Sequence, residues 1–251
     1  MSERRGHYSY TYYADSANAQ SFDARRFGGP IGDLVAKGQA DVLADMLGPV
    51  QGRRIIDVGT GTGRGAFLLA AAGAHVTGID ASEQMLALAK QRAIDTHTTS
   101  VDFQVGDAHQ ILFGDRSFDV AVSLRVLMHT PRWRRCIGEL CRVASHGVVL
   151  DYPSATSSAV VESLVRKVLH PLGLASEPYR VFLGGQIRRE LASHGFRVTS
   201  VHRQFVLPIA VHKAIGSRGF TVGSERLLER TGLLALFGSP VTLVAERCAS
   251  S

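Results

Sequence analysis

Short apolar runs alternate with longer segments of helical periodicity through the first three fifths of the chain. Apolar residues recur every three or four positions in the longer segments, whereas the short runs are continuous and end at polar or glycine positions. Strands that alternate with helices in this way predict a doubly wound parallel sheet. The expected strands are 54–57, 75–80, 101–105, 118–123 and 147–151, and the expected helices between them are 66–72, 83–90 and 131–143.

The remaining segments extend the same α/β pattern. An amphipathic helix is expected over 32–47, and a leucine stripe in the helical stretch 209–236 is typical of core packing rather than of a membrane contact. We see neither an internal repeat nor a linker, so residues 1–251 are predicted to form a single domain. The other expected elements are a helix at 186–194, closed by Gly195, and strands at 196–207 and 241–247.

Composition narrows the class of protein. With 251 residues and 45% hydrophobic content, the chain is long enough for one large α/β domain. No apolar run approaches the roughly 20 residues of a membrane span, and the first residues contain no apolar signal segment. Cys136, Cys141 and Cys248 are odd in number and lack the spacing of metal ligands. A cytoplasmic protein without a metal is therefore expected.

The chain is basic, with a net charge of +6 and an isoelectric point near 9.5. Clustered arginine would suit the phosphates of nucleic acid. No stretch interleaves arginine with stacking aromatic residues, so a nucleic-acid partner is disfavoured and arginine on solvated helix faces is favoured. An anionic small molecule, or a lipid at an anionic membrane surface, would also match this charge. The adjacent arginine pairs are 25–26, 53–54, 134–135 and 188–189.

The stretch 54–65 carries the strongest motif. A strand ends at Asp57 and is followed by Gly59, Gly61 and Gly63 before a helix begins. Such a turn lets backbone N–H groups approach a ligand closely. The segment Gly61–Ala66 satisfies the dinucleotide pattern G-x-G-x-x-A, while an acid followed by G-x-G-x-G is typical of S-adenosylmethionine (SAM) enzymes. Asp57 favours SAM, because a carboxylate suits the ammonium of a methionine and opposes a pyrophosphate.

A second acid follows at the distance expected of one βαβ unit. Asp80 ends the strand 75–80, roughly 20 residues after the glycines, where its carboxylate can accept both hydroxyls of a ribose. NAD and SAM enzymes share this device, so Asp80 indicates a nucleoside without choosing between them. The structural alternative is that Asp80 or Ser82 caps the helix that follows.

A third motif distinguishes the two cofactors. The strand 101–105 is followed by Gly106-Asp107-Ala108, and Phe118-Asp119-Val120 opens the next strand. In order and spacing, the four features resemble class I SAM-dependent methyltransferases of the small-molecule type found in ubiquinone and menaquinone biosynthesis. The resemblance is good over 55–153 and covers the rest in outline.

The resemblance implies a Rossmann-like, mostly parallel seven-stranded sheet whose last strand is antiparallel. It also implies an N-terminal helical lid within 1–30 and an insertion at 154–184 that forms the acceptor pocket. His170, Tyr179 and Phe182 are expected in that pocket, and Tyr13, Arg26 and Tyr179 are the candidate substrate contacts. The cofactor-binding residues that the resemblance implies are Asp57, Gly59, Thr60, Gly61, Gly63, Asp80, Ala81, Met85, Asp107, Ala108, Leu124 and Arg125.

Methyl transfer from a sulfonium needs mainly positioning, because the leaving group is already good. A base is required when the acceptor must lose a proton, and His129 lies just beyond the strand 118–123, where the methyl group is expected. The alternative is a structural histidine. Arg125 could bind an acceptor carboxylate or phosphate. The amino-methyltransferase motif, Asn or Asp followed by two prolines and an aromatic, is absent after 123, which favours oxygen or carbon acceptors.

Other functions remain open at this point. The leading prediction is a SAM-dependent methyltransferase that acts on a small or lipid-like molecule, with a peripheral membrane contact left open. An RNA methyltransferase and a SAM-binding protein without catalysis are the alternatives. A NAD-dependent oxidoreductase is disfavoured by Asp107. The sequence gives no information on oligomeric state.

Overall fold

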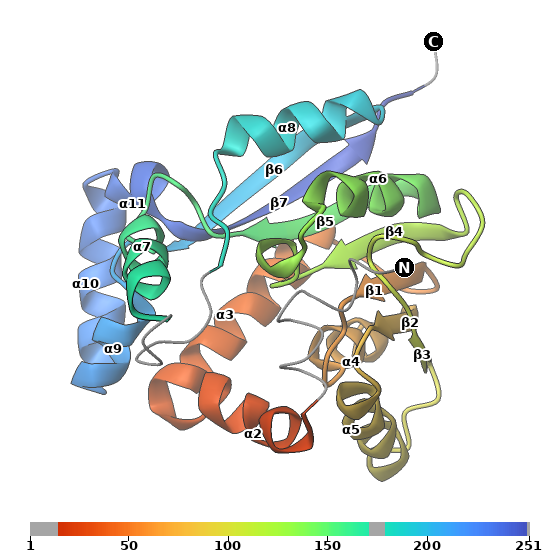
Figure 1. Ribbon diagram of the computed structural model, residues 1–251, viewed down its shortest axis with the longest axis horizontal. Coiled ribbons are helices and arrows are strands. Elements are labelled where there is room, and N and C mark those ends of the chain that lie inside the picture. Colours follow the sequence, from red (N-terminus) through yellow and green to blue (C-terminus); the bar gives the residue numbers. More distant parts are fainter. Residues whose placement is uncertain (1–14, 171–178, 250–251) are drawn as a thin grey trace.

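A seven-stranded sheet forms the centre of the molecule, with helices on both of its faces (Figure 1). The computed structural model describes residues 15–170 and 179–249, without the side chains of 16–18 and 25. The strand order is β3-β2-β1-β4-β5-β7-β6. The strands are β1 (Arg54–Val58), β2 (His75–Asp80), β3 (Val101–Val105), β4 (Phe118–Ser123), β5 (Ala144–Tyr152), β6 (Phe196–Phe205) and β7 (Ser239–Arg247).

Strands β1 to β5 pair in parallel, and β7 pairs antiparallel with β5 on one side and β6 on the other. The mostly parallel sheet and the antiparallel last strand are therefore confirmed. The strand order reverses between β1 and β4, which lie side by side at the centre. In a doubly wound sheet the crevice at such a reversal, beyond the carboxyl ends of the strands, is where ligands bind.

Successive strand residues supply two separate cores. Ile55 packs with α3 (Gly29–Leu47), α4 (Arg64–Ala71) and α5 (Glu83–Asp95), whereas its neighbour Ile56 packs with α6 (Trp133–Val143) and α8 (Gly184–Ser193). Val148 and Val149 divide between the two cores in the same way. Because side chains alternate across a strand, a sheet covered on both faces requires the continuous apolar runs seen in the sequence.

The remaining helices come from the N-terminal part of the chain, from the segment after β5 and from the stretch between β6 and β7. Helix α2 precedes α3 and lies near α5, as the tertiary contacts and Figure 1 show. Among the described residues, no helix combines the length and apolar character needed to cross a bilayer. These remaining helices are α2 (Ser16–Phe27), α7 (Ala159–Leu169), α9 (Ile209–Ile215), α10 (Arg218–Arg230) and α11 (Leu233–Phe237).

Two details differ from the sequence prediction. The helix expected from position 131 begins at Trp133, and the stretch 209–236 is divided into three helices. Gly216 and Gly232 make these breaks, with φ of 68° and 78°. Backbone with positive φ cannot continue a right-handed helix.

The leucine stripe of this stretch does not join a core. Leu227 is 63% exposed, and its partners in the stripe are half-buried. The prediction of core packing for Leu227, Leu228, Leu233 and Leu234 is therefore wrong.

Candidate functional site

The turn after β1 carries three glycines whose surroundings differ. Their φ values are 75° at Gly59, 55° at Gly61 and 81° at Gly63. A Cβ at Gly59 would lie 2.2 Å from a Val126 methyl, and a Cβ at Gly63 would lie 2.8 Å from the Phe103 ring. A Cβ at Gly61 would meet nothing within 4 Å. Gly59 and Gly63 are thus closed by packing, whereas Gly61 leaves its backbone open to a ligand.

The carboxyl of Asp57, in β1, is buried close to the first turn of α4. Its Oδ2 accepts a 2.7 Å hydrogen bond from the Thr60 hydroxyl. Burial raises the pKa of Asp57 to about 6, although this hydrogen bond and one from the Ala66 backbone oppose the rise. A ligand cation beside this carboxyl would be stabilised, because opposite charge favours the ionised form.

The carboxyl of Asp80 connects the glycine turn to the end of β2. Its Oδ2 accepts a 2.8 Å hydrogen bond from the Gly61 N–H, and its Oδ1 accepts one of 2.8 Å from the Ser82 N–H. Ser82, rather than Asp80, caps α5, since its hydroxyl accepts from the Met85 N–H at 3.1 Å. Burial raises the pKa of Asp80. Asp80 is therefore held at the turn, beside Gly61, without serving as the helix cap.

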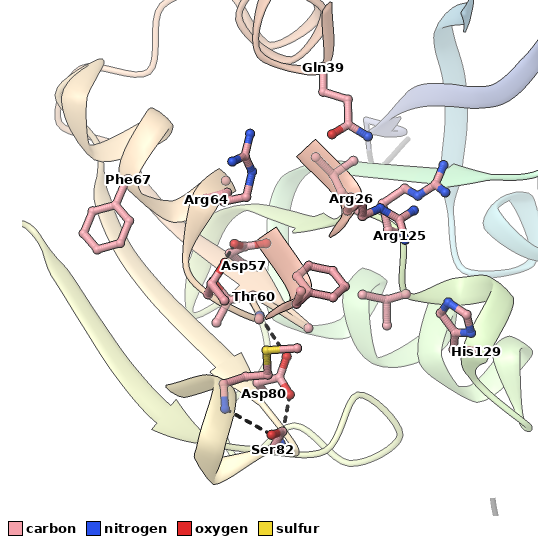
Figure 2. Close-up of a pocket in the computed structure, with 18 of the residues that line it drawn as sticks. Arg26, Gln39, Asp57, Thr60, Arg64, Phe67, Asp80, Ser82, Arg125 and His129 are labelled. Carbon is pink, nitrogen blue, oxygen red and sulfur yellow. Dashed lines mark hydrogen bonds between the residues drawn. The ribbon is translucent and has the colours of Figure 1, made fainter. Parts of the chain in front are cut away.

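A cavity of about 580 Å³ brings most of the predicted residues together (Figure 2). It lies where the segments after β1, β2, β3 and β4 meet, beneath the N-terminal helices. The predicted residues that line it are Asp57, Gly59, Thr60, Gly61, Asp80, Ala81, Met85, Ala108, Leu124 and Arg125 from the cofactor set, together with Arg26 and His129.

Two predicted cofactor residues do not line this cavity. Gly63 is the N-cap of α4 and packs on Phe103. Asp107 turns its Oδ1 towards His109, accepting from the His109 N–H and lying 2.8 Å from its Nδ1. His109 itself is buried and lines the cavity. His109, two residues after Asp107 of the predicted cofactor set, was missed because its type and spacing match no motif.

The end of β4 forms the opposite wall. Ser123 donates from its hydroxyl to the Val58 carbonyl at 3.0 Å, joining β4 to β1. Arg125 then takes a left-handed conformation, with φ of 64°, and its backbone N–H donates to Oδ1 of Asp151 in β5. His129 ends the short 3₁₀ helix η2 (Leu127–His129) and is half-buried in the wall.

The cover of the cavity comes from α2, which falls within the segment 1–30 predicted as a lid, and from α3. Phe22, Arg26 and Phe27 of α2 and Gln39 of α3 line it. Asp23 fastens α2 to the glycine turn and to α5. Its carboxylate accepts from the Thr62 hydroxyl at 3.1 Å and from Arg92 at 2.9 Å. Arg92 also donates to the Thr62 carbonyl at 3.2 Å, so the three residues form one clasp.

The described part of the insertion lies outside the cavity lining. Phe182 is 1% exposed and packs edge-to-face on Trp133, with ring centroids 5.3 Å apart. Tyr179 is buried, its carbonyl accepts from the Ser163 hydroxyl, and burial raises the pKa of its phenol. His170 follows α7. None of these three residues lines the cavity, and Tyr179 and Phe182 pack in the core instead. Tyr13 lies outside the described residues.

The residues of the cavity fit the SAM expected from the sequence. Gly61 provides open backbone, Asp80 provides an acid beside it, and Asp57 provides a buried acid whose ionisation a ligand cation would favour. Ala81, Met85 and Ala108 add apolar surface for a base. Two carboxyls at the turn oppose a diphosphate, so NAD fits less well.

Comparison with known proteins agrees with this geometry. A family model described as a methyltransferase domain matches residues 56–150. A demethylmenaquinone methyltransferase of Thermus thermophilus is 32% identical over 180 residues, which are 70% of this chain and 77% of the relative. An O-methyltransferase of Penicillium expansum is 29% identical over 202 residues, which are 75% and 69% of the two chains.

A solved structure shares the fold over nearly the whole chain. The magnesium protoporphyrin IX methyltransferase of Synechocystis, crystallised with S-adenosylhomocysteine (SAH), superposes with a TM-score of 0.66. The alignment covers 95% of this chain and 97% of the other at 20% identity.

Proposed function

The chain belongs to the class I SAM-dependent methyltransferases, and we propose that it methylates an oxygen or carbon atom of a small-molecule acceptor. The observation that carries this proposal is the meeting of Gly61, Asp57 and Asp80 on one cavity at the carboxyl edge of the sheet. Two relatives support the choice of acceptor atom. The Penicillium protein is named an O-methyltransferase, and the Thermus protein is named for demethylmenaquinone.

The residues divide the cavity into two sides (Figure 2). Asp57, Thr60 and Asp80 lie on the side of the glycine turn, where Asp57 would hold the ammonium and Asp80 the ribose of the cofactor. Arg125 and His129 lie on the other side, at the end of β4. The acceptor would therefore enter beside β4.

Bound SAM supplies an electrophilic methyl group, so that the acceptor atom bonds to carbon as the carbon–sulfur bond breaks and SAH leaves. The protein's part is to align the two reactants and to exclude water. Phe22, Phe27 and Leu43 give the cavity an apolar cover. Where the acceptor is a hydroxyl or an acidic C–H, its proton passes to His129, which is the proposed general base.

A lipid-like acceptor is supported by the outer surface. Val161, Leu164, Val165 and Val168 lie on one face of α7 and are 64%, 55%, 48% and 69% exposed. Since the chain is also basic, we propose that this face contacts an anionic membrane from which the acceptor is taken. Co-sedimentation with anionic but not with neutral vesicles tests this contact, with Val165→Asp as the variant expected to lose it. Cytoplasmic location stays a prediction.

Titration calorimetry tests the cofactor assignment. We expect SAM and SAH to bind and NAD not to bind. Asp80→Ala should weaken SAH binding at least tenfold, because it removes the acid that faces the ribose. Asp102→Ala, an exposed acid on neighbouring β3, is the matched control and should bind normally. Binding of NAD in place of SAH would refute the proposal.

Transfer of a labelled methyl group tests catalysis. We expect label in hydroxyaromatic or quinol acceptors and none in bulk tRNA. Label in tRNA alone would support an RNA methyltransferase. Tight SAH binding without label in any phenol, quinol, lipid or RNA pool would support a SAM-binding protein without catalysis.

A further inference from the structure

The arginines that line the cavity separate into two places. Figure 2 shows Arg64 on the side of Asp57 and Thr60, whereas Arg26 and Arg125 lie on the side of His129. The Arg64 guanidinium stacks 3.8 Å from the centre of the Phe27 ring, close to the glycine turn. Arg64 is therefore on the cofactor side, as is Arg92, which also lines the cavity and donates to the Thr62 carbonyl of the glycine turn. Arg26 and Arg125 border the acceptor side.

The position of Arg125 is fixed by its backbone. The residue has a φ of 64°, and its N–H is held by Asp151, which is only 4% exposed. A residue other than glycine seldom keeps such a conformation unless its surroundings impose it. The backbone of β4 and the buried acid of β5 thus direct one guanidinium at a defined part of the cavity wall.

Among the described residues, the guanidinium of Arg125 lies near the Asp151 carboxyl without forming an ion pair with it. Its Nε is buried, and no residue of 15–170 or 179–249 offers this atom a hydrogen-bond acceptor. In the same part of the chain, the ion pairs within 4.0 Å do not include Arg125. The Asp151 carboxylate accepts a hydrogen bond from the backbone N–H of Arg125 rather than pairing with the Arg125 guanidinium. The Nε–H of this guanidinium therefore remains for a ligand.

A second guanidinium adds to this charge. Arg26 on α2 and Arg125 both hold down the pKa of Asp151, which burial raises, so both cations lie near that one carboxyl. Both cations make this wall basic, which suits an anionic group on the acceptor.

We infer that the acceptor carries a carboxylate, which Arg125 and Arg26 bind while the methyl group is transferred to another atom of the same molecule. This inference rests on the proposed function, because it assigns the β4 side of the cavity to the acceptor. A guanidinium fork binds a carboxylate through two parallel charge-assisted hydrogen bonds, which fixes orientation as well as affinity. Arg125 and Arg26 would thus determine which acceptors are accepted and how they face the cofactor.

Three single-ring probes test the inference on the protein saturated with SAH: hydroxybenzoate, its uncharged analogue hydroxybenzamide, and phenyl phosphate. Their dissociation constants are measured by saturation-transfer NMR titration. Hydroxybenzoate should bind about tenfold more tightly than hydroxybenzamide, the ratio expected of one charge-assisted contact. Equal affinity of the two, or tighter binding of phenyl phosphate, would overturn the inference.

Variants locate the effect. Arg125→Gln should reduce hydroxybenzoate affinity to that of the amide, while Arg125→Lys should keep part of the preference. Arg197→Gln removes an exposed arginine of β6 outside the cavity and should keep all of it. Arg26→Gln gives a second test at the same wall, which also serves if Arg125→Gln does not fold.

The affinity for SAH separates this inference from the proposed function. If SAH does not bind the wild type, the proposed function fails. If SAH binds but carboxylate preference is absent, the inference alone fails. A loss of SAH affinity in Arg125→Gln, with a normal melting temperature, would assign the arginine to the cofactor and would also overturn the inference.

Discussion

The clasp that fastens α2 over the cavity leads to the most specific prediction. Asp23 of α2 accepts from Thr62 in the glycine turn and from Arg92 in α5. Replacing Asp23 by alanine breaks both contacts and leaves the cavity lining residues in place. If α2 closes over the cofactor, the energy of these contacts belongs to the bound state. The affinity for SAH should then fall by the corresponding factor.

The size of the expected loss in SAH affinity follows from how exposed the clasp residues are to solvent. Arg92 and Asp23 are 40% and 26% exposed, so their 2.9 Å ion pair is screened by solvent and is worth about 0.5 kcal/mol. The Thr62 hydrogen bond contributes about 1 kcal/mol. Together they give about 1.5 kcal/mol, or roughly a tenfold loss of affinity.

Titration calorimetry with SAH measures this change. The control is Asp41→Ala, which removes the carboxylate of an exposed ion pair with Lys37 on α3, with side chains 76% and 55% exposed. We expect its SAH affinity to be unchanged. If the Asp23→Ala protein binds SAH as tightly as the wild type, then α2 does not close on the cofactor.

The remaining predictions concern the turn, the buried acid and the base. Gly61→Arg should abolish SAH binding without unfolding the protein, because its side chain would fill the open space there; retention of binding would place the cofactor elsewhere. The pKa of Asp57 is raised from 3.8 to about 6, so without ligand its proton stabilises the fold below about pH 4 and this stabilisation is lost as the pH rises through about 6. The free energy of unfolding, measured in urea at both ends of that pH range, should fall with rising pH in the wild type but not in Asp57→Asn. The same fall in the variant would contradict the assignment to Asp57. His129→Gln should slow transfer to a hydroxyl acceptor about 100-fold and flatten the pH–rate profile, with normal SAH affinity. An unchanged profile would leave His129 a structural role.

Local sequence patterns were sufficient to predict the strands of the central sheet. Continuous apolar pairs such as Ile55-Ile56 and Val148-Val149 are required of strands covered on both faces, and they are confirmed as such. The glycine turn was predictable because its motif lies within one βαβ unit. Gly61 shows this most clearly, since its open Cβ position lies at the cavity itself.

Features that depend on contacts between distant segments were not predictable. The clasp joins Asp23 to residues 39 and 69 positions away, and although Thr62 lies in the glycine motif, no local pattern pairs it with Asp23 or Arg92. Asp151 lies 26 residues from Arg125, and only the pairing of β4 with β5 brings the two together. In the insertion, by contrast, local sequence led to a prediction that was wrong. Aromatic residues such as Phe182 matched an expected pocket, but packing on Trp133 takes them into the core.

The connection between α2 and α3 has a consequence for turnover. Gly28 separates the two helices, and Gly29, the first residue of α3, has a φ of 74°. Two contacts hold α2 just before this joint: the clasp at Asp23, and the Arg26 carbonyl, which accepts from Lys213 of α9 at 3.0 Å. If α2 is the lid over the cofactor, the spent cofactor and the methylated product would leave past this helix. Its opening would then set an upper limit on the number of catalytic cycles per second.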